Sequence, residues 1–283
     1  MVSIIIVNYN RKDLLRQCLD SLRGQSFRDM EIIVADNASK DGSVDMLRAY
    51  YPEVKLIRNA DNLLFCKAQN QGIDISSGDF ILCLNSDVML EKEYLKQALN
   101  SMNSDAGIGM VSGKLLRMDR KIIDSTGLFL GRNRKAVERG YGEIDKGLYN
   151  KPEYVFGVSG ACAFLRKTML KEIKDKYGYF DERFGMYYED LDLCWRANKK
   201  GWKAYYNPNA VAYHVRGGTA AGPDYSGGRI FPYIKRDLKR RYIINRYRCM
   251  IKNDSIINFL MNLPFILWYD IKIWCYFAIS SFF

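Results

Sequence analysis

Apolar and polar positions alternate in blocks along the first half of the chain. Short runs rich in β-branched residues occur at residues 3–7, 31–35, 54–57, 80–84 and 108–111, with amphipathic, helix-length segments between them. Strands separated in this way need crossover helices, which makes their sheet mostly parallel. The run at residues 80–84 is apolar throughout, as a strand covered on both faces requires. We therefore predict an α/β fold with a doubly wound, mostly parallel sheet and helices on both faces.

The pattern changes after residue 111. Glycine-punctuated segments at residues 122–130 and 155–165 are joined by a charged stretch, residues 132–151, which we expect to be a mobile loop. Helical periodicity returns at residues 189–200 and stops at Gly201. These changes indicate one domain over residues 1–230, with halves of about 1–112 and 113–230, followed by a helical tail over residues 231–283.

The tail is basic at first and then apolar. Lys and Arg are frequent over residues 235–252, whereas Ile, Leu, Phe, Trp and Tyr dominate residues 256–283. A membrane-spanning helix needs about 20 apolar residues in a row, and Pro264, Asp270 and Lys272 interrupt this segment. We expect helices that lie in the headgroup region of an anionic membrane. The alternative is a tail that packs on the domain or mediates a dimer.

Composition narrows the class of protein. With 48% hydrophobic residues among 283, the chain can bury a large core, and its formal charge of +11 indicates a polyanionic partner. Nucleic acid, anionic lipid and a phosphorylated substrate all fit that charge. The seven cysteines include no C-x-x-C pair, so neither a disulfide framework nor a zinc site is indicated, and a reducing cytoplasm is expected. Residues 2–7 fit a first strand better than a signal peptide.

Polar residues follow each predicted strand of the first half. In an open α/β sheet, ligands bind beyond the carboxyl ends of the strands. Asp36 comes directly after the second strand, where its carboxylate can accept hydrogen bonds from a nucleotide base; an Asx turn or helix cap is the alternative. Asp87 ends the sequence Asn85-Ser86-Asp87 after the fourth strand. A hard divalent cation takes one or two such carboxylates together with phosphate oxygens, so Asp87 is a candidate metal ligand.

Three carboxylates lie close together at the start of the helix predicted at residues 189–200. They are Glu189, Asp190 and Asp192, and Tyr187, Tyr188 and Trp195 around them offer aromatic faces for stacking a sugar. Transfer to a hydroxyl needs a general base within reach of its proton. We assign that role to Asp190 and expect Glu189 to hold the acceptor or a neighbouring side chain. The alternative is an ordinary capped amphipathic helix.

His214 is the only histidine of the chain, and it precedes the sequence Val215-Arg216-Gly217-Gly218-Thr219. A lone histidine is more often packed than functional. Here it ends an apolar run and opens a glycine-rich loop with an arginine, which suits a segment that closes over a diphosphate.

Taken together, these motifs resemble the inverting glycosyltransferases of family 2, which have the GT-A fold, and within them the rhamnosyltransferase-like branch. The resemblance covers residues 2–219 and rests on the segments 3–10, 36–43, 62–72, 85–87, 189–196 and 214–219. It implies that residues 1–112 form a nucleotide-binding half and residues 113–230 an acceptor and catalytic half. Two positions depart from the family pattern: Asn85 replaces the usual first aspartate of D-x-D, and Leu64 stands where glycine is expected.

The resemblance also assigns roles to residues. The implied nucleotide-binding residues are Val7, Tyr9, Asp36, Lys67 and Ser86. Asp87 and His214 would bind Mg²⁺ or Mn²⁺, and Asp190 matches the catalytic base, with Glu189 beside it. The implied reaction is one in-line displacement that inverts the anomeric configuration.

The expected function is therefore transfer of a sugar, with rhamnose suggested by the branch, from a nucleotide-diphosphate donor to a glycan or lipid-linked saccharide for cell-surface polysaccharide. We expect a cytoplasmic enzyme, peripheral at the inner face of the cell membrane, with no nucleic acid partner. The absence of G-x-G-x-x-G after the first strand and of a P-loop argues against a dinucleotide oxidoreductase and a P-loop NTPase. A non-catalytic membrane- or nucleic-acid-binding relative is the alternative.

Overall fold

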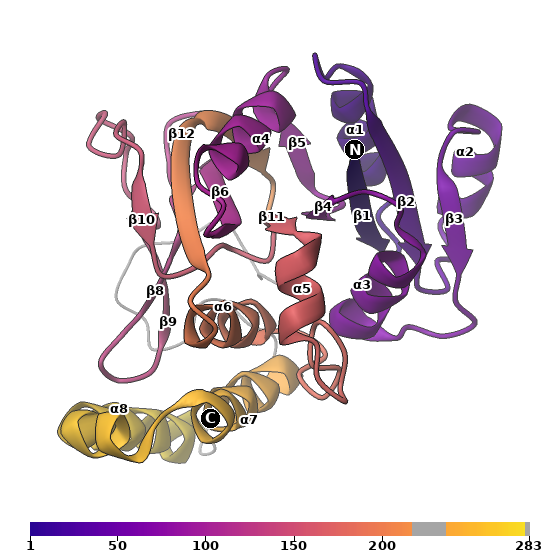
Figure 1. Cartoon of the computed structure of the whole chain (residues 1–283). Helices are drawn as coiled ribbons and strands as arrows, with labels where there is room; N and C mark the ends of the chain where they lie inside the picture. Colours follow the sequence, from indigo (N-terminus) through magenta and orange to yellow (C-terminus); the bar gives the residue numbers. More distant parts are fainter. Residues whose placement is uncertain (217–235, 281–283) are drawn as a thin grey trace.

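The computed structural model describes residues 1–216 and 236–280, with side chains described except at residues 236–237 and 277–280 (Figure 1). The strands in chain order are β1 (Val2–Asn8), β2 (Met30–Asp36), β3 (Lys55–Arg58), β4 (Phe80–Asn85), β5 (Val88–Leu90), β6 (Ile108–Arg117), β7 (Ile123–Ser125), β8 (Leu128–Leu130), β9 (Ala136–Glu138), β10 (Glu153–Val155), β11 (Cys162–Arg166) and β12 (Lys203–His214). The helices are α1 (Lys12–Arg23), α2 (Ser43–Tyr50), α3 (Leu64–Ile75), α4 (Tyr94–Ser104), α5 (Lys167–Ile173), α6 (Glu189–Lys199), α7 (Arg236–Asn253) and α8 (Ile256–Ser280).

Ten strands form one central sheet, in which β10, β12, β6, β11, β4, β1, β2 and β3 follow one another in that order. The pairs joining β4, β1, β2 and β3 are parallel, as predicted for the first half of the chain. β11 then pairs antiparallel with both β4 and β6, so it joins the two halves into one sheet. β12 returns parallel to β6, and β5 pairs with the end of β12.

Helices cover both faces of the sheet, as predicted, because the strands bury alternate residues on opposite sides. On one face Ile4, Ile6 and Leu82 pack with the apolar sides of α1, α2 and α4. On the other face Ile5 and Ile81 pack with α3, α5 and α6, and this core continues into α7 and α8. Figure 1 shows α6 below the sheet, with α7 and α8 beyond it.

The charged stretch at residues 132–151 is not the loose loop that its composition indicated. It contains β9, which pairs with β8. Arg134 is 4% exposed and bonds Asp254, while Lys114 Nζ on β6 bonds Asp145 Oδ2 at 2.8 Å. The charges that suggested a solvated loop instead form its ties to the sheet and to the segment between the tail helices.

The tail forms two helices, and Pro264, Asp270 and Lys272, which interrupt its apolar run, do not interrupt the second helix. α8 runs continuously from Ile256 to Ser280 with Pro264 inside it. Its charges have local partners: Asp270 Oδ1 accepts a hydrogen bond from Arg246 Nη1 of α7 at 2.5 Å, and Lys272 Nζ lies 4.8 Å from the centroid of the Trp268 ring. By length and composition alone, the 21 residues Ile256–Tyr276 could cross a bilayer.

Candidate active site

The carboxyl ends of the first-half strands meet at one edge of the sheet. Val7 on β1 is in register with Ala35 on β2 and with Asn85 on β4, and Asn8 is in register with Asp36. The sheet therefore places the predicted nucleotide-binding residues of β1 and β2 beside the Asn85-Ser86-Asp87 sequence. Val7 is half-buried and Tyr9 is 48% exposed, so the Tyr9 ring is accessible at this edge.

Asp36 is fixed within its turn. It is 2% exposed, and its Oδ2 accepts a hydrogen bond from Asn8 Nδ2 at 2.9 Å while its Oδ1 accepts one from the Ser39 amide at 2.9 Å. These contacts form the Asx-type turn that was the alternative reading. A carboxylate accepts about four hydrogen bonds, so the turn also leaves capacity for a ligand. Asp41 binds the first residue of α2, since its Oδ1 accepts a hydrogen bond from the Ser43 amide at 3.0 Å.

Lys67 is exposed on α3. This helix begins at Leu64, the residue that stands where glycine is expected. Leu64 has a φ of 63°, in the left-handed region where glycine is favoured. The turn keeps this conformation because Asn62 Oδ1 accepts from the Leu64 amide at 3.0 Å and Asn37 Nδ2 donates to the Leu64 carbonyl at 3.2 Å. The backbone that glycine would allow is therefore present despite the side chain.

Asp87 and His214 meet, although 127 positions separate them. β5 pairs antiparallel with the end of β12, and the Val215 amide donates to the Asp87 carbonyl at 3.0 Å. His214 Nε2 lies 3.2 Å from Asp87 Oδ1, and Nδ1 lies 2.7 Å from Oδ2 of the fully buried Asp124. Arg216 Nε donates to the other oxygen of Asp124. Ser86 is 8% exposed beside this group.

The charges of this group shift one another's pKa values. Burial lowers the pKa of His214, but hydrogen bonds to Asp124 and Asp87 outweigh it and raise that pKa to about 9. Burial raises the pKa of Asp87, whereas the hydrogen bond with His214 more than reverses this and holds it below its usual range. The imidazolium of His214 and the guanidinium of Arg216 together offset the charges of the two aspartates.

A divalent cation fits these residues only with help from a substrate. Within residues 1–216 and 236–280, no group of three or more His, Cys, Asp or Glu side chains is arranged to hold a metal. Asp87 and His214 nevertheless direct one oxygen and one nitrogen toward each other. Asp124 fixes the orientation of the histidine ring, as partners of metal-binding histidines do. Two protein ligands plus phosphate oxygens is the usual arrangement for Mg²⁺ at nucleotides.

Asp190 lies beside the Asn85-Ser86-Asp87 sequence through two backbone contacts. Its Oδ2 accepts from the Gly160 amide at 3.1 Å, and the carbonyl of the next residue, Ala161, accepts from the Asn85 amide at 2.9 Å. Its Oδ1 accepts from the Leu191 amide at 2.7 Å at the start of α6. The pairing of β11 with β4 therefore brings the predicted base to the end of β4, near the predicted metal ligand Asp87.

Glu189, which is buried, and Asp190, which is half-buried, are neighbouring acids with raised pKa values. Burial is the main cause for both, and the charge of Asp190 raises the pKa of Glu189 further. Hydrogen bonds from the Gly160 and Leu191 amides oppose the shift at Asp190. Glu189 is 9% exposed, and its Oε2 has no hydrogen-bond partner among the described residues. The carboxylate with backbone donors is the one better suited to ionise and accept a proton.

The aromatic residues around this pair do not present free faces for a sugar. Tyr188 and Trp195 are 3% and 7% exposed. The rings of Tyr187 and Tyr188 both pack edge-on against Tyr242 of α7. The sequence placed them correctly beside the acids, but they serve the contact with the tail, because α7 covers this side of α6.

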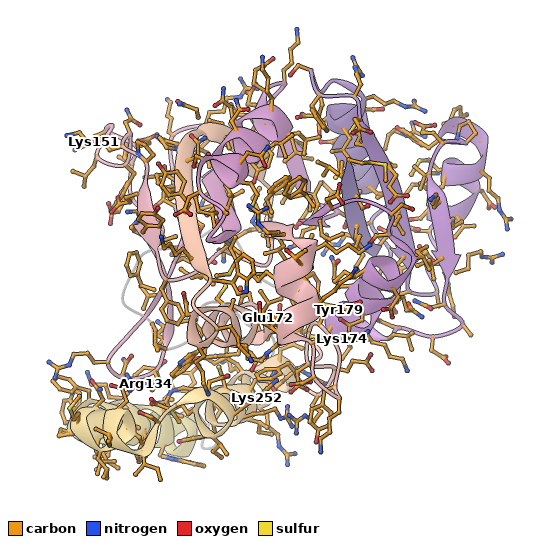
Figure 2. The ribbon with its side chains drawn as sticks, viewed as in Figure 1. Arg134, Lys151, Glu172, Lys174, Tyr179 and Lys252 are labelled. Carbon is orange, nitrogen blue, oxygen red and sulfur yellow. The ribbon has the colours of Figure 1, made fainter. Side chains whose placement is uncertain are left out.

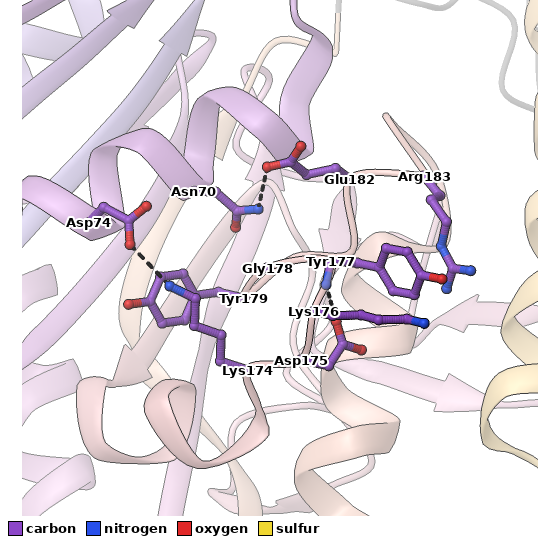
Figure 3. Close-up of a pocket in the computed structure, with 10 residues that line it drawn as sticks. All are labelled: Asn70, Asp74, Lys174, Asp175, Lys176, Tyr177, Gly178, Tyr179, Glu182 and Arg183. Carbon is purple, nitrogen blue, oxygen red and sulfur yellow. Dashed lines mark hydrogen bonds and ion pairs between the residues drawn. The ribbon is translucent and has the colours of Figure 1, made fainter.

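A surface cavity of about 540 Å³ lies elsewhere, between α3 and the loop after α5 (Figure 3). None of the predicted site residues lines it. Its two tyrosine rings already carry cations: Lys174 Nζ is 4.1 Å from the Tyr179 centroid, and Arg183 Cζ is 3.5 Å from the Tyr177 centroid. The Asp87, His214 and Asp190 group is therefore the better candidate for catalysis.

Comparisons with known proteins identify the family of the chain. The sequence profile of Glycosyl transferase family 2 matches residues 3–174, which is more than half of the chain. The chain belongs to glycosyl transferase family 2. This family 2 glycosyltransferase is 28% identical over 223 residues to the amylovoran biosynthesis glycosyltransferase AmsB of Erwinia amylovora, covering 75% of this chain and 69% of AmsB. It is 25% identical over 236 residues to the N-acetylglucosaminyl-diphospho-decaprenol L-rhamnosyltransferase of Mycobacterium tuberculosis, covering 76% of each chain.

The fold of the glycosyltransferase also has solved counterparts. A mannosyltransferase from Pyrobaculum calidifontis, solved in complex with GDP-Man and Mn²⁺, superposes with a TM-score of 0.62 at 16% identity, covering 95% of this chain and 69% of the other. The predicted GT-A fold is thereby confirmed.

Sequence reasoning missed three groups of the candidate site, two carboxylates and one backbone amide. Asp124 on β7 holds His214, the Gly160 amide holds Asp190, and Glu138 on β9 lies 3.9 Å from Arg216. Burial raises the pKa of Glu138 to about 7. All three lie in the glycine-punctuated second half, where no motif marks them. The predicted glycine-rich loop at residues 217–219 lies outside the described residues.

Proposed function

We propose that this glycosyltransferase is an inverting, metal-dependent enzyme that moves a hexose from a nucleotide-diphosphate donor to a hydroxyl of a glycan or lipid-linked saccharide. The observation that carries the proposal is the convergence of Asp87, His214 and Asp190 at the ends of β4, β12 and α6. The relative named as an L-rhamnosyltransferase favours rhamnose as the sugar, and the amylovoran relative favours cell-surface polysaccharide as the product.

In the proposed reaction Asp190 accepts the proton of the acceptor hydroxyl while the oxygen of that hydroxyl attacks the anomeric carbon of the donor sugar. The bond between that carbon and the diphosphate oxygen breaks on the opposite face, so the configuration inverts. Asp87 and His214 would hold Mg²⁺ or Mn²⁺, which supplies positive charge to the diphosphate that leaves. Tyr9, Asp36 and Lys67 would contact the nucleotide, which is supported by the register of Asn8 with Asp36 and by the hydrogen bond from Asn37 to the start of α3.

The acidic character of the site supports the metal. Five carboxylates gather there, namely those of Asp87, Asp124, Glu138, Glu189 and Asp190, and the cations near them include His214, Arg216 and, close to Asp87, Arg11. A dianionic diphosphate that binds beside these carboxylates needs a neutralising cation, because like charges repel strongly in a site that is shielded from water.

We further propose that the enzyme works at the cytoplasmic face of the cell membrane. The support is α8, whose outward side chains are apolar: Ile256, Ile257 and Leu260 are 80%, 73% and 58% exposed. Arg240 and Lys272 are exposed on the same pair of helices and would attract anionic headgroups. A membrane-seated transferase suits a lipid-linked acceptor.

The test is donor hydrolysis and transfer by the purified protein over a panel of nucleotide sugars, with Mg²⁺ or Mn²⁺ and with EDTA. We compare wild type with Asp190→Asn and Asp87→Ala, and use Asp45→Asn on the exposed side of α2 as the matched control. Turnover of one donor that EDTA and both site variants abolish, and that Asp45→Asn retains, supports the proposal. If no donor turns over with any metal or lipid-linked acceptor, a non-catalytic membrane-binding relative becomes the better account.

A further inference from the structure

The turn that leads into Glu189 and Asp190 has an unfavourable backbone. Gly185, Tyr187 and Tyr188 have φ values of 67°, 67° and 69°. Two consecutive tyrosines in the left-handed region are costly, because their Cβ atoms crowd the backbone there. Strained backbone of this kind persists only where surrounding contacts determine it. The residues holding the turn therefore also determine where the acidic pair lies.

One side chain of the tail holds most of this turn. Asn245 of α7 is 1% exposed, and its Nδ2 lies 2.8, 2.9 and 2.9 Å from the carbonyl oxygens of Phe184, Met186 and Tyr187. Its two N–H groups thus serve three acceptors. Its Oδ1 accepts from Arg248 Nη1 at 2.8 Å, which fixes the orientation of the amide. A side chain without N–H donors would leave these carbonyls without this partner.

The same turn also contacts the donor side of the site. The Gly185 carbonyl accepts from the amides of Phe65 and Cys66 at 3.0 and 3.1 Å, at the start of α3. That helix carries Lys67 one residue further on and begins at the strained Leu64. The turn is thus bonded to α7 on one side and to α3 on the other.

We propose that Asn245 is a positioning residue for the Glu189 and Asp190 pair, acting through the turn at residues 184–188 rather than through substrate. The inference rests on the proposed function, in which Asp190 is the base. The tail would then contribute to catalysis as well as to membrane contact. Removing the Asn245 amide should relax the turn and displace Asp190 while Asp87 and His214 stay in place, because their contacts involve β5, β7 and β12.

The same helix provides a matched control. Asn253 of α7 is also buried, at 3% exposed, and its Nδ2 donates to Asp192 Oδ1 at 2.8 Å and to the Cys249 carbonyl at 3.2 Å. It ties α7 to α6 at Asp192, two residues after Asp190, and has no hydrogen bond to the turn at residues 184–188. Asn245→Leu and Asn253→Leu both keep the number and branching of side-chain heavy atoms, enlarge the side chain equally and remove a buried amide of α7.

The experiment measures kcat and donor KM for the full chain, together with Tm and amide hydrogen exchange. Asn245→Leu should lower kcat by about 100-fold, as displacement of a reacting group by about 1 Å does, with the donor KM within about threefold of wild type. Asn253→Leu should lower Tm about as much as Asn245→Leu does, but it should keep kcat within about threefold of wild type. Asn245→Gln keeps two N–H donors and should recover part of the lost kcat.

Exchange of the amides at residues 184–191 should rise in Asn245→Leu and not in Asn253→Leu. Equal losses of kcat in the two leucine variants, or unchanged exchange in Asn245→Leu, would overturn the proposal. The exchange comparison needs no turnover, so it decides whether Asn245 holds the turn even if the wild type proves inactive. An inactive wild type would instead count against the proposed function.

Discussion

At the scale of single residues, Asp124 is the largest addition that the structure makes to the predicted site. Its position in the short strand β7 follows no motif, because the sequence Ile-Asp-Ser around it is equally compatible with a surface strand. Its function depends on a contact with His214, 90 positions away, that only the pairing of β6 with β7 and β12 creates. Such a partner cannot be read from local sequence.

We predict that Asp124→Asn weakens metal binding. The neutral amide would lose the charge-assisted contact with His214 Nδ1 and leave Arg216 without its buried counter-ion, so the imidazole would be less well oriented. Binding of Mn²⁺ in the presence of a nucleoside diphosphate, followed by calorimetry, should weaken by about 10- to 100-fold. Asp119→Asn, an exposed aspartate in the turn before β7, should change it little. Equal affinities for wild type and Asp124→Asn would show that Asp124 does not serve the metal.

Leu64 shows how a departure from a family pattern can be misleading. Glycine is expected at this position, and leucine disfavours positive φ. The structure retains the glycine-like backbone through Asn62 and Asn37. The polar residues of the motif, rather than the glycine alone, determine this turn.

At the scale of elements, the predictable part of the fold is the part built from locally patterned strands and helices. The predicted strands at residues 3–7, 31–35 and 80–84 match β1, β2 and β4 to within a residue or two at each end. The antiparallel insertion of β11 was not predictable, because its sequence only shows an apolar run and strand direction depends on the connection. The strand β6 also extends to Arg117, well beyond the predicted end at residue 111.

The contact between α7 and the loop before α6 should make stability depend on acid pH. Burial raises the pKa of Asp181, but hydrogen bonds from Arg183 and Lys252 outweigh it and lower that pKa to about 2. A lowered folded-state pKa stabilises the ionised form, so this contribution is complete above about pH 4 and is lost as pH falls toward about 2. From a shift of roughly two pKa units, it amounts to about 2 kcal/mol.

We therefore expect Asp181→Asn to lower the free energy of unfolding in urea by at least about 2 kcal/mol at pH 6. The difference from wild type should shrink as the pH is lowered from 5 to 3. Asp74→Asn removes an exposed pair with Lys174 and should cost less than about 1 kcal/mol at either pH. A loss that does not depend on pH would assign the stabilisation to packing rather than to the charge of Asp181.

At the scale of the whole molecule, the tail is attached to the catalytic domain by buried polar contacts. Arg246 is fully buried and bonds Asp270 of α8 and the Asn133 carbonyl at 2.6 Å. Arg134 Nη2 donates to the Asn258 carbonyl of α8 at 3.1 Å. Figure 2 labels Arg134 and Lys252, both at the junction between the tail helices and the rest of the chain. Composition predicted a basic and apolar tail, but the tertiary partners of its charges were not readable from sequence.

These contacts favour a helix that lies on a membrane over one that crosses it. α8 buries Ile266, Tyr269 and Ile273 against the protein, whereas Trp268 and Trp274 are each 61% exposed on its outer side. Crossing a bilayer would require breaking the Arg246 and Asp270 contact and leaving the buried guanidinium without its carboxylate partner, which costs several kcal/mol. An interfacial position keeps every one of these contacts.

We predict that the protein sediments with vesicles containing anionic lipid and that alkaline carbonate releases it. The double variant Trp268→Ser with Trp274→Ser should bind at least about 10-fold more weakly, since each exposed tryptophan contributes apolar area and interfacial preference. Ile144→Ser with Leu148→Ser is the matched control, because these residues are 62% and 76% exposed but lie outside the tail, and it should bind like wild type. Resistance to carbonate would show that α8 inserts across the bilayer. Equal binding by both double variants would show that the exposed tryptophans of α8 do not contribute to membrane binding, which would then be due to the basic surface.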